Sequence, residues 1–153
     1  MHTFEHTVEI AAPVEHVFAF DSDPENWTRT MASMRDLEII EETEEGARMR
    51  ASYTLLGIST DLEMELTVVE PNEHIVVTME GDGVTGELHN YFAETDSGTQ
   101  LRHHAEYDLG DSLFDRIVAP VASSYNDRQL KSHLENTKDM VEAEVAAETA
   151  APA

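Results

Sequence analysis

A regular alternation of apolar and polar residues, repeated along most of the chain, is the feature that most constrains its fold. It is clearest over residues 61–68 and 101–109, where every second residue except His103 is apolar. Successive side chains of a strand point to opposite faces, so this period predicts strands with one dry and one wet face. One strand is expected at Thr3–Ile10 and six more between Asp36 and Leu109. The turns between these six are predicted at Glu45-Gly46, Gly57, Pro71-Asn72, Gly81-Asp82-Gly83 and Asp96-Ser97-Gly98.

Helices are predicted on both sides of this strand-rich region. Pro13 suits a first helical turn, and Asp23 followed by Pro24 is a typical helix start, so two short helices should follow the first strand. Apolar residues recur at helical spacing from Asp111 to about Val145, which predicts a long helix that covers the dry face of the sheet. Pro120 predicts a break or kink near Ala119, with a short first helix and a longer second one.

A chain of 153 residues fits one ordinary domain, which we place at residues 1–145. The alanine-rich remainder, residues 146–153, has no long apolar side chain and is expected to be a disordered tail. Consecutive hairpins predict an antiparallel, seven-stranded sheet of an α+β protein, packed on the C-terminal helix.

Acidic residues outnumber basic ones heavily: 32 Asp and Glu stand against 9 Lys and Arg, for a net charge of −23. This charge is spread along the chain, and we interpret it as an adaptation to a salt-rich cytoplasm, where repulsion between like charges is screened. An ordinary acidic protein is the alternative. Since no basic patch is present, nucleic acids and anionic membranes are not expected as partners.

The chain contains no cysteine, which excludes disulfides, thiolate metal sites and cysteine nucleophiles. Neither a signal peptide nor a long apolar segment is recognisable, so we expect a cytoplasmic protein without membrane insertion. No metal site is expected either. His103 and His104 point to opposite faces of a strand, and His2 and His6 would lie about 13 Å apart along another. No cofactor motif is found, and nothing in the sequence indicates the oligomeric state.

Several short motifs occur in a particular order: Ala12–Phe18 then Asp23–Asn26, followed by Gly46–Met49, Val68–Pro71 and Gly98–Thr99. In this order they resemble the START-like superfamily, often called SRPBCC, and in particular its polyketide cyclase/dehydrase and lipid-transport branch. The resemblance implies a helix-grip fold, as in START proteins and the birch-pollen allergen, in which a curved sheet surrounds the C-terminal helix. It also implies a cavity for an apolar ligand, but it identifies neither the ligand nor a shared catalytic motif.

Side chains that the alternation sends inward are the candidates for lining such a cavity. The predicted ligand-binding residues are Met49, Tyr53, Met64, Met79, His103, Tyr107, Val121, Tyr125 and Trp27. Each has a simpler alternative role in core packing, and for Trp27 the alternative of anchoring a helix on the sheet is favoured over direct ligand contact. The segment Leu88–Phe92 does not indicate which of its faces is buried.

His103 is also a weak catalytic candidate, because the pKa of histidine lies close to neutrality. The alternative is a buried histidine held by a tyrosine hydroxyl or a backbone carbonyl. We therefore expect a carrier or sensor that binds a small hydrophobic ligand, such as a lipid or polyketide. A cyclase/dehydrase-type enzyme using His103 or a tyrosine, without metal, is one alternative. A protein-interaction module similar to the Hsp90-activator homologues is another.

Overall fold

The structure, a computed structural model, describes residues 2–55, 58–81, 84–108 and 113–150. Strand β1 is followed by three short helical segments, then by six strands and a long helix. In chain order these are β1 (His2–Ile10), α1 (Val14–Asp21), η1 (Pro24–Asn26), α2 (Trp27–Thr30), β2 (Met34–Thr43), β3 (Gly46–Leu55), β4 (Ile58–Glu70), β5 (His74–Gly81), β6 (Val84–Thr95), β7 (Gly98–Asp108) and α3 (Leu113–Ala150).

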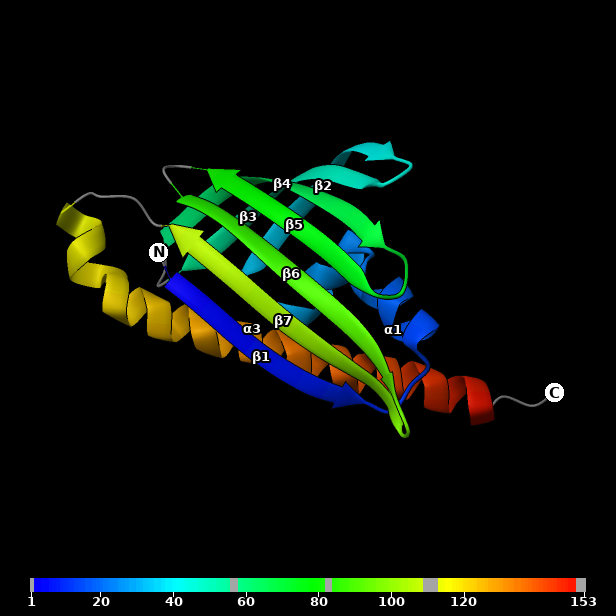
Figure 1. The fold of residues 1–153 in the computed structure, drawn as a ribbon. Helices are drawn as coiled ribbons and strands as arrows, with labels where there is room; N and C mark the ends of the chain where they lie inside the picture. Colours follow the sequence, from blue (N-terminus) through cyan, green and yellow to red (C-terminus); the bar gives the residue numbers. More distant parts are fainter. Residues whose placement is uncertain (1, 56–57, 82–83, 109–112, 151–153) are drawn as a thin grey trace.

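The seven strands form one antiparallel sheet in the order β1-β7-β6-β5-β4-β3-β2. Neighbours from β2 to β7 are joined by hairpins. The first strand, β1, pairs with the last strand, β7. The sheet curves, and α3 runs across its concave side next to β1, with α1 on the same side (Figure 1). The predicted α+β helix-grip fold is therefore confirmed.

Strand register decides which side chains face α3. His6, His103 and Asn90 occupy one row across β1, β7 and β6, because His6 pairs with His103 and His103 with Asn90. Asn90 and Phe92 are buried, while His89 and Tyr91 are only partly covered. The orientation of the Leu88–Phe92 segment, open from the sequence, is thus settled by its pairing partners.

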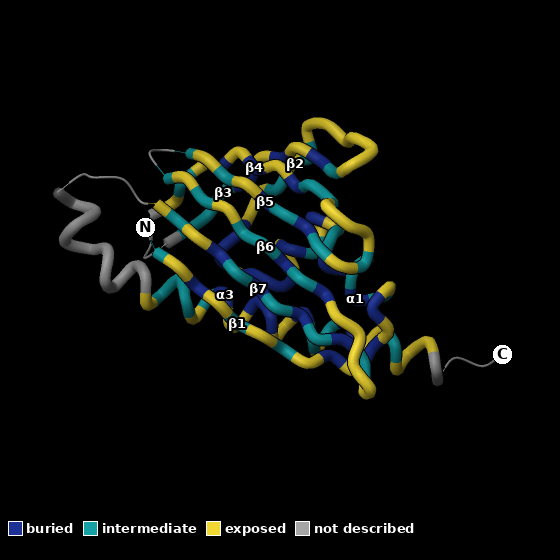
Figure 2. Tube along the Cα trace, viewed as in Figure 1, coloured by how far each residue is buried: buried dark blue, intermediate teal, exposed yellow. Residues whose placement is uncertain are grey.

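The main core lies where α1 and the second half of α3 meet the sheet. Leu130, Leu134 and Val141 of α3 are almost fully buried, as are Ile10 and Leu101 of the sheet. Figure 2 shows buried residues alternating with less buried ones along the strands, and exposed residues at the β2–β3 and β6–β7 hairpins. The outer face is polar, and Arg48 and Arg50 pair there with acids of neighbouring strands, as expected from their parity.

Helix α3 differs from its prediction at both ends. Of the break or kink predicted near Ala119, the break is absent, because α3 is a single helix through Pro120; it also continues to Ala150, beyond the expected end at Val145. A proline removes only one backbone hydrogen bond, and the turns on either side retain theirs. Alanine has the highest helix propensity, which favours continuation past Val145. No helix of the described residues is both long and apolar enough to span a membrane.

Candidate functional site

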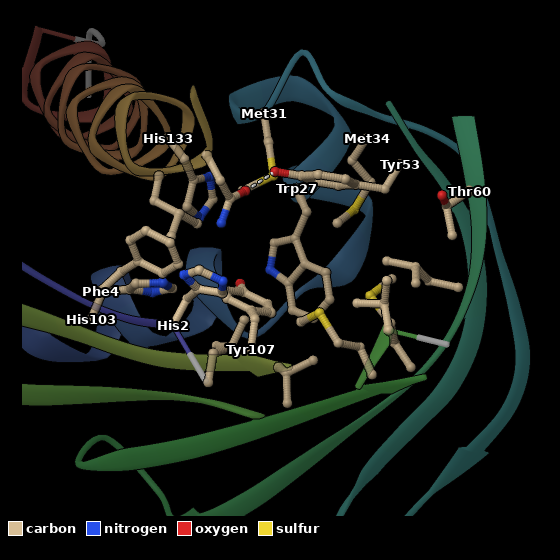
Figure 3. A pocket seen from close by; sticks show the side chains of 18 of the residues that line it. His2, Phe4, Trp27, Met31, Met34, Tyr53, Thr60, His103, Tyr107 and His133 are labelled. Carbon is tan, nitrogen blue, oxygen red and sulfur yellow. Dashed lines mark hydrogen bonds between the residues drawn. The ribbon is translucent and has the colours of Figure 1, made fainter. Parts of the chain in front are cut away.

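A cavity opens between the concave face of the sheet and helices α2 and α3, and all seven strands contribute to its wall (Figure 3). Its volume is about 110 Å³, counted as space for the centres of water molecules. On this measure one water needs roughly 10–15 Å³, so an organic molecule of one or two rings fits. The lining residues are His2, Phe4, Trp27, Met31, Met34, Tyr53, Thr60, Leu62, Met64, Val77, Met79, Val84, Leu88, Asn90, His103, Tyr107, Asn126, Leu130 and His133.

Most of the predicted ligand-binding residues lie in this wall. They are Trp27, Tyr53, Met64, Met79, His103 and Tyr107. Met49 differs from its prediction, because it does not line the cavity. It is almost fully buried in the core, where it pairs with Met64 of the neighbouring strand β4. Tyr125 is partly buried on α3 but is not part of the lining either. The side chain of Val121 lies outside the described residues.

Other lining residues were not singled out from the sequence. His133 lies on the face of α3 that also carries Leu130 and Leu134, so its helical spacing could have identified it. Phe4 and His2 follow the inward parity of the first strand. Asn126 gave no such signal, because its position is evident only once Tyr53 of β3 donates a hydrogen bond to its side-chain oxygen.

Four methionines, Met31, Met34, Met64 and Met79, make up much of the apolar wall. Their unbranched thioether side chains can repack around ligands of different shape. The ring of Tyr107 lies over Gly86 on the neighbouring strand, where an added Cβ would come within 2.5 Å of the ring. Glycine at this position therefore leaves the space that the Tyr107 ring occupies.

A chain of buried hydrogen bonds joins α1 to the cavity wall. The Asn90 Nδ2 group donates to Asp21 Oδ2 at 2.6 Å, and Asn90 Oδ1 lies 2.7 Å from His103 Nδ1. The exposed fractions are 1% for Asp21, 4% for Asn90 and 2% for His103, so bulk water does not compete for these bonds. They are correspondingly strong and directional.

Burial sets the protonation states of Asp21 and His103, the two residues at the ends of these hydrogen bonds. It raises the pKa of Asp21 to about 6, although the hydrogen bond from Asn90 counteracts part of the effect. Burial also lowers the pKa of His103 to about 3, helped by the nearby His133, His6 and His104. Above pH 7, Asp21 is therefore mostly ionised and His103 is neutral.

These protonation states determine the tautomer of His103. An ionised carboxylate only accepts hydrogen bonds, so the amide nitrogen of Asn90 must face Asp21 and its oxygen must face His103. The Nδ1 atom of His103 then carries the proton and donates a hydrogen bond to Oδ1 of Asn90. This leaves a lone pair on Nε2, which is buried and has no hydrogen-bond partner among the described residues.

His133, Tyr53 and Tyr107, which also line the cavity, are neutral as well. Burial lowers the pKa of His133 to about 4, and its Nδ1 is 2.8 Å from the hydroxyl of Thr30. The rings of His103 and His133 lie at 71° to each other with centroids 6.5 Å apart. Burial raises the pKa of Tyr53 to about 12 and that of Tyr107 further above its usual value. No Asp, Glu, Lys or Arg occurs among the described residues that line the cavity.

This arrangement suits hydrogen bonding better than proton transfer. With a pKa of about 3, His103 is a weak general base at neutral pH, although its Nε2 can accept a hydrogen bond from a ligand. Within the described part of the chain, no group of three or more His, Cys, Asp or Glu residues is placed to hold a metal ion.

Comparisons with solved structures identify the same fold in other proteins. A protein of Thermus thermophilus has a TM-score of 0.83 and 19% identity, over 93% of this chain and 98% of its own. The Zhui aromatase/cyclase of Streptomyces sp. R1128 has a TM-score of 0.83 and 17% identity, over 94% of each chain. A START superfamily protein of Mycobacterium smegmatis has a TM-score of 0.75 and 19% identity, over 94% of this chain and 99% of its own.

None of the curated proteins matches this chain. A family model, in contrast, matches residues 1–142, nearly the whole of the described fold, and its description is polyketide cyclase/dehydrase and lipid transport. The curved sheet, the long C-terminal helix and the cavity between them agree with this match. The chain belongs to the polyketide cyclase/dehydrase and lipid transport family.

Proposed function

We propose that this protein binds a small hydrophobic ligand in the cavity between the sheet and α3, as a carrier or sensor. The observation that carries the proposal is the cavity itself, which combines an apolar, methionine-rich wall with a few polar side chains. Such a combination is typical of small-molecule sites, in which apolar surface supplies affinity and polar groups orient the ligand.

An enzyme of the cyclase/dehydrase kind is the second candidate. The unpartnered Nε2 of His103 favours it, since a ring nitrogen in a cavity can take part in proton transfer. The structural likeness to an aromatase/cyclase from Streptomyces also supports it. The low pKa of His103 argues against it, because a base of pKa about 3 removes a proton inefficiently at neutral pH. Binding therefore ranks first.

The interaction-module alternative has less support. A large, contiguous exposed apolar patch is a typical mark of a docking surface. Among the described residues, the large hydrophobic side chains that are exposed are Ile40 and Val69, on different strands.

The ligand-binding proposal is tested by native mass spectrometry of freshly purified protein and by fluorescence. Trp27 is the only tryptophan and lines the cavity, so its emission reports on occupancy. We expect a co-purifying apolar compound whose extraction changes Trp27 emission and whose readdition restores it. Protein that carries no such compound and whose emission is unaffected by a panel of apolar molecules contradicts the proposal.

A pair of variants separates the cavity from the rest of the sheet. Met79→Phe fills part of the cavity and should weaken binding, whereas Val69→Phe changes an exposed residue outside it. Equal binding by both variants would place the ligand elsewhere. For the enzymatic alternative, a reaction that is lost in His103→Ala while ligand binding survives would reverse the ranking.

A further inference from the structure

We propose that the cavity selects an uncharged ligand with a hydroxyl or similar hydrogen-bond donor, which donates to Nε2 of His103. Asp21 and Asn90 are positioning residues in this proposal: they do not bind the donor, but they hold His103 in the tautomer that accepts it. The inference rests on the proposed function, because it specifies the chemistry of the ligand in the same cavity.

Asp21 occupies an unusual position for a carboxylate, since it is almost fully buried. A carboxylate that is 1% exposed loses most of its hydration, and the hydrogen bond from the Asn90 side chain offsets only part of that loss. Its place at the end of α1 does not explain this burial, because the negative end of the helix dipole repels a carboxylate. The burial is explained by the effect of Asp21 on Asn90, because an ionised Asp21 permits only one orientation of the Asn90 amide.

The orientation of Asn90 in turn fixes the tautomer of His103. An Asn90 amide held in this orientation presents its oxygen to His103, which must donate from Nδ1. The same logic operates where a carboxylate or carbonyl holds a histidine in one tautomer through its other ring nitrogen. The lone pair of Nε2 is therefore set before a ligand arrives, which reduces the entropic cost of recognition.

The Nε2 atom of His103 is buried and has no partner among the described residues. Buried polar atoms nearly always have a partner, so one that borders a cavity indicates a ligand or an ordered water. A ligand donor satisfies it. A ligand that offers only acceptor atoms leaves it unpaired and brings two lone pairs together.

Charge restricts the ligand further. The described lining residues include no Lys or Arg, and the chain as a whole carries a net charge of −23. A carboxylate or phosphate in this cavity would lose its hydration without gaining a counter-charge from these residues. Uncharged molecules with a hydroxyl group, phenols and alcohols among them, are the class that fits both restrictions.

The tautomer can be measured without any ligand. Long-range ¹H–¹⁵N correlation spectra of labelled protein at pH 7.5 distinguish a proton on Nδ1 from one on Nε2. We expect the proton of the His103 ring on Nδ1. A proton on Nε2 would overturn the inference regardless of what binds, and this measurement uses the wild-type chain, so it does not depend on any variant folding.

The ligand class is tested with three matched probes, followed by quenching of Trp27: 2-naphthol, 2-methoxynaphthalene and 2-naphthoate. They share one ring system but offer a donor, an acceptor and an anion, respectively. We expect 2-naphthol to bind about tenfold more tightly than 2-methoxynaphthalene, as for one buried hydrogen bond, and 2-naphthoate to bind most weakly. Equal affinity for the first two, or preferred binding of the anion, refutes the selectivity. Failure of all three to bind counts against the proposed function, and the inference falls with it.

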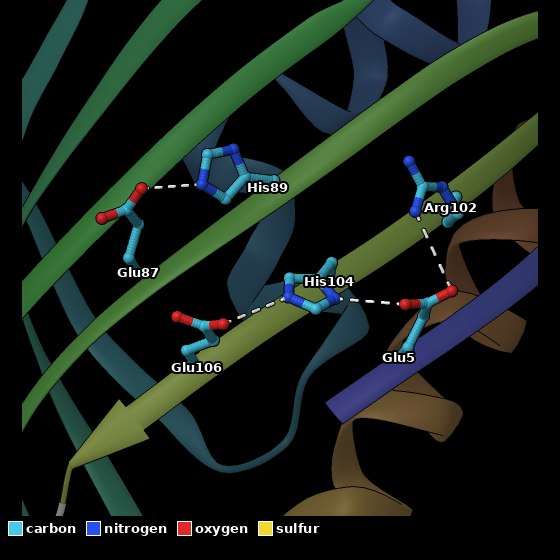
Figure 4. A network of polar contacts seen from close by, with 6 residues as sticks. All are labelled: Glu5, Glu87, His89, Arg102, His104 and Glu106. Carbon is cyan, nitrogen blue, oxygen red and sulfur yellow. Dashed lines mark hydrogen bonds and ion pairs between the residues drawn. The ribbon is translucent and has the colours of Figure 1, made fainter. Parts of the chain in front are cut away.

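Variants then assign the selectivity to the bonded chain. His103→Phe keeps a ring but removes the acceptor, and should abolish the preference for 2-naphthol without preventing 2-methoxynaphthalene from binding. Its matched control, His104→Phe, changes the next residue of β7 on the outer face, where His104 contacts Glu5 and Glu106 (Figure 4). This control should retain the full preference.

The positioning role of Asp21 is tested by two substitutions. Asp21→Asn keeps an oxygen acceptor but adds an amide donor, so both orientations of the Asn90 amide become possible; the preference should weaken and part of His103 should shift to the other tautomer. Asp21→Leu removes that acceptor and should reduce the preference and populate the other tautomer of His103. A merely structural role for Asp21 predicts instead that Asp21→Leu lowers stability while the preference and the tautomer stay as in the wild type.

Discussion

The buried carboxyl of Asp21 should make the stability of this protein depend on pH in a direction opposite to that of most acidic residues. Burial raises its pKa from 3.8 to about 6, so the native state binds a proton that the unfolded state has already released. The stabilising contribution is complete below pH 3.8 and is lost as the pH rises through 6. At 1.36 kcal/mol per pKa unit, ionised Asp21 costs about 3 kcal/mol at pH 7.5.

Asp21→Asn isolates this effect, because asparagine retains an oxygen that accepts the bond from Asn90 but has no charge to desolvate. Urea unfolding, followed by far-UV circular dichroism between pH 4 and 7.5, gives the free energy of unfolding of both proteins. We expect the variant to gain stability relative to the wild type as the pH rises, by up to about 3 kcal/mol.

The informative quantity is the difference in free energy of unfolding between Asp21→Asn and the wild type. His103 and His133 have lowered pKa values, so they reduce the stability of both proteins as the pH falls below 6.5, and their effect cancels in the difference. Asp61→Asn, at an exposed position of β4, is the control and should show no such trend. A difference for Asp21→Asn that is constant with pH, or that grows toward acid pH, would refute the reasoning.

Three further predictions concern packing and charge. Gly86→Ala adds a Cβ that would lie 2.5 Å from the Tyr107 ring, so the ring must move. We expect a loss of about 1–3 kcal/mol in stability together with weaker ligand binding, measured by urea unfolding and Trp27 quenching. Unchanged values for both would show that the ring has room to move. Leu134→Ala in α3 should cost about 2–5 kcal/mol of unfolding free energy, because Leu134 is almost fully buried, and a cost below 1 kcal/mol would mean that α3 is loosely packed. The net charge of −23 predicts a melting temperature that rises steeply with KCl, and no change between dilute buffer and about 2 M KCl would remove the salt-adaptation interpretation.

Much of the cavity wall could be anticipated from parity alone. Tyr53, Met64, Met79, His103 and Tyr107 sit at positions where the strand period sends side chains inward, and the structure places all of them in the lining. Parity does not state where along a strand the core ends and the cavity begins. This is why Met49, which has the right parity, is core rather than lining.

Local periodicity and turn chemistry, which are properties of short segments, were therefore enough to determine the strands, the short helices and, outside Leu88–Phe92, which face of the sheet is buried. The bonded chain of Asp21, Asn90 and His103 was decided only by tertiary structure, since its members are separated by 69 and 13 residues. Nothing local marks Asp21 as buried: it ends a short helix and resembles a solvated residue. Its burial, its raised pKa and the resulting tautomer of His103 arise because sheet curvature brings α1 against β6, and such long-range packing leaves no trace in the local pattern.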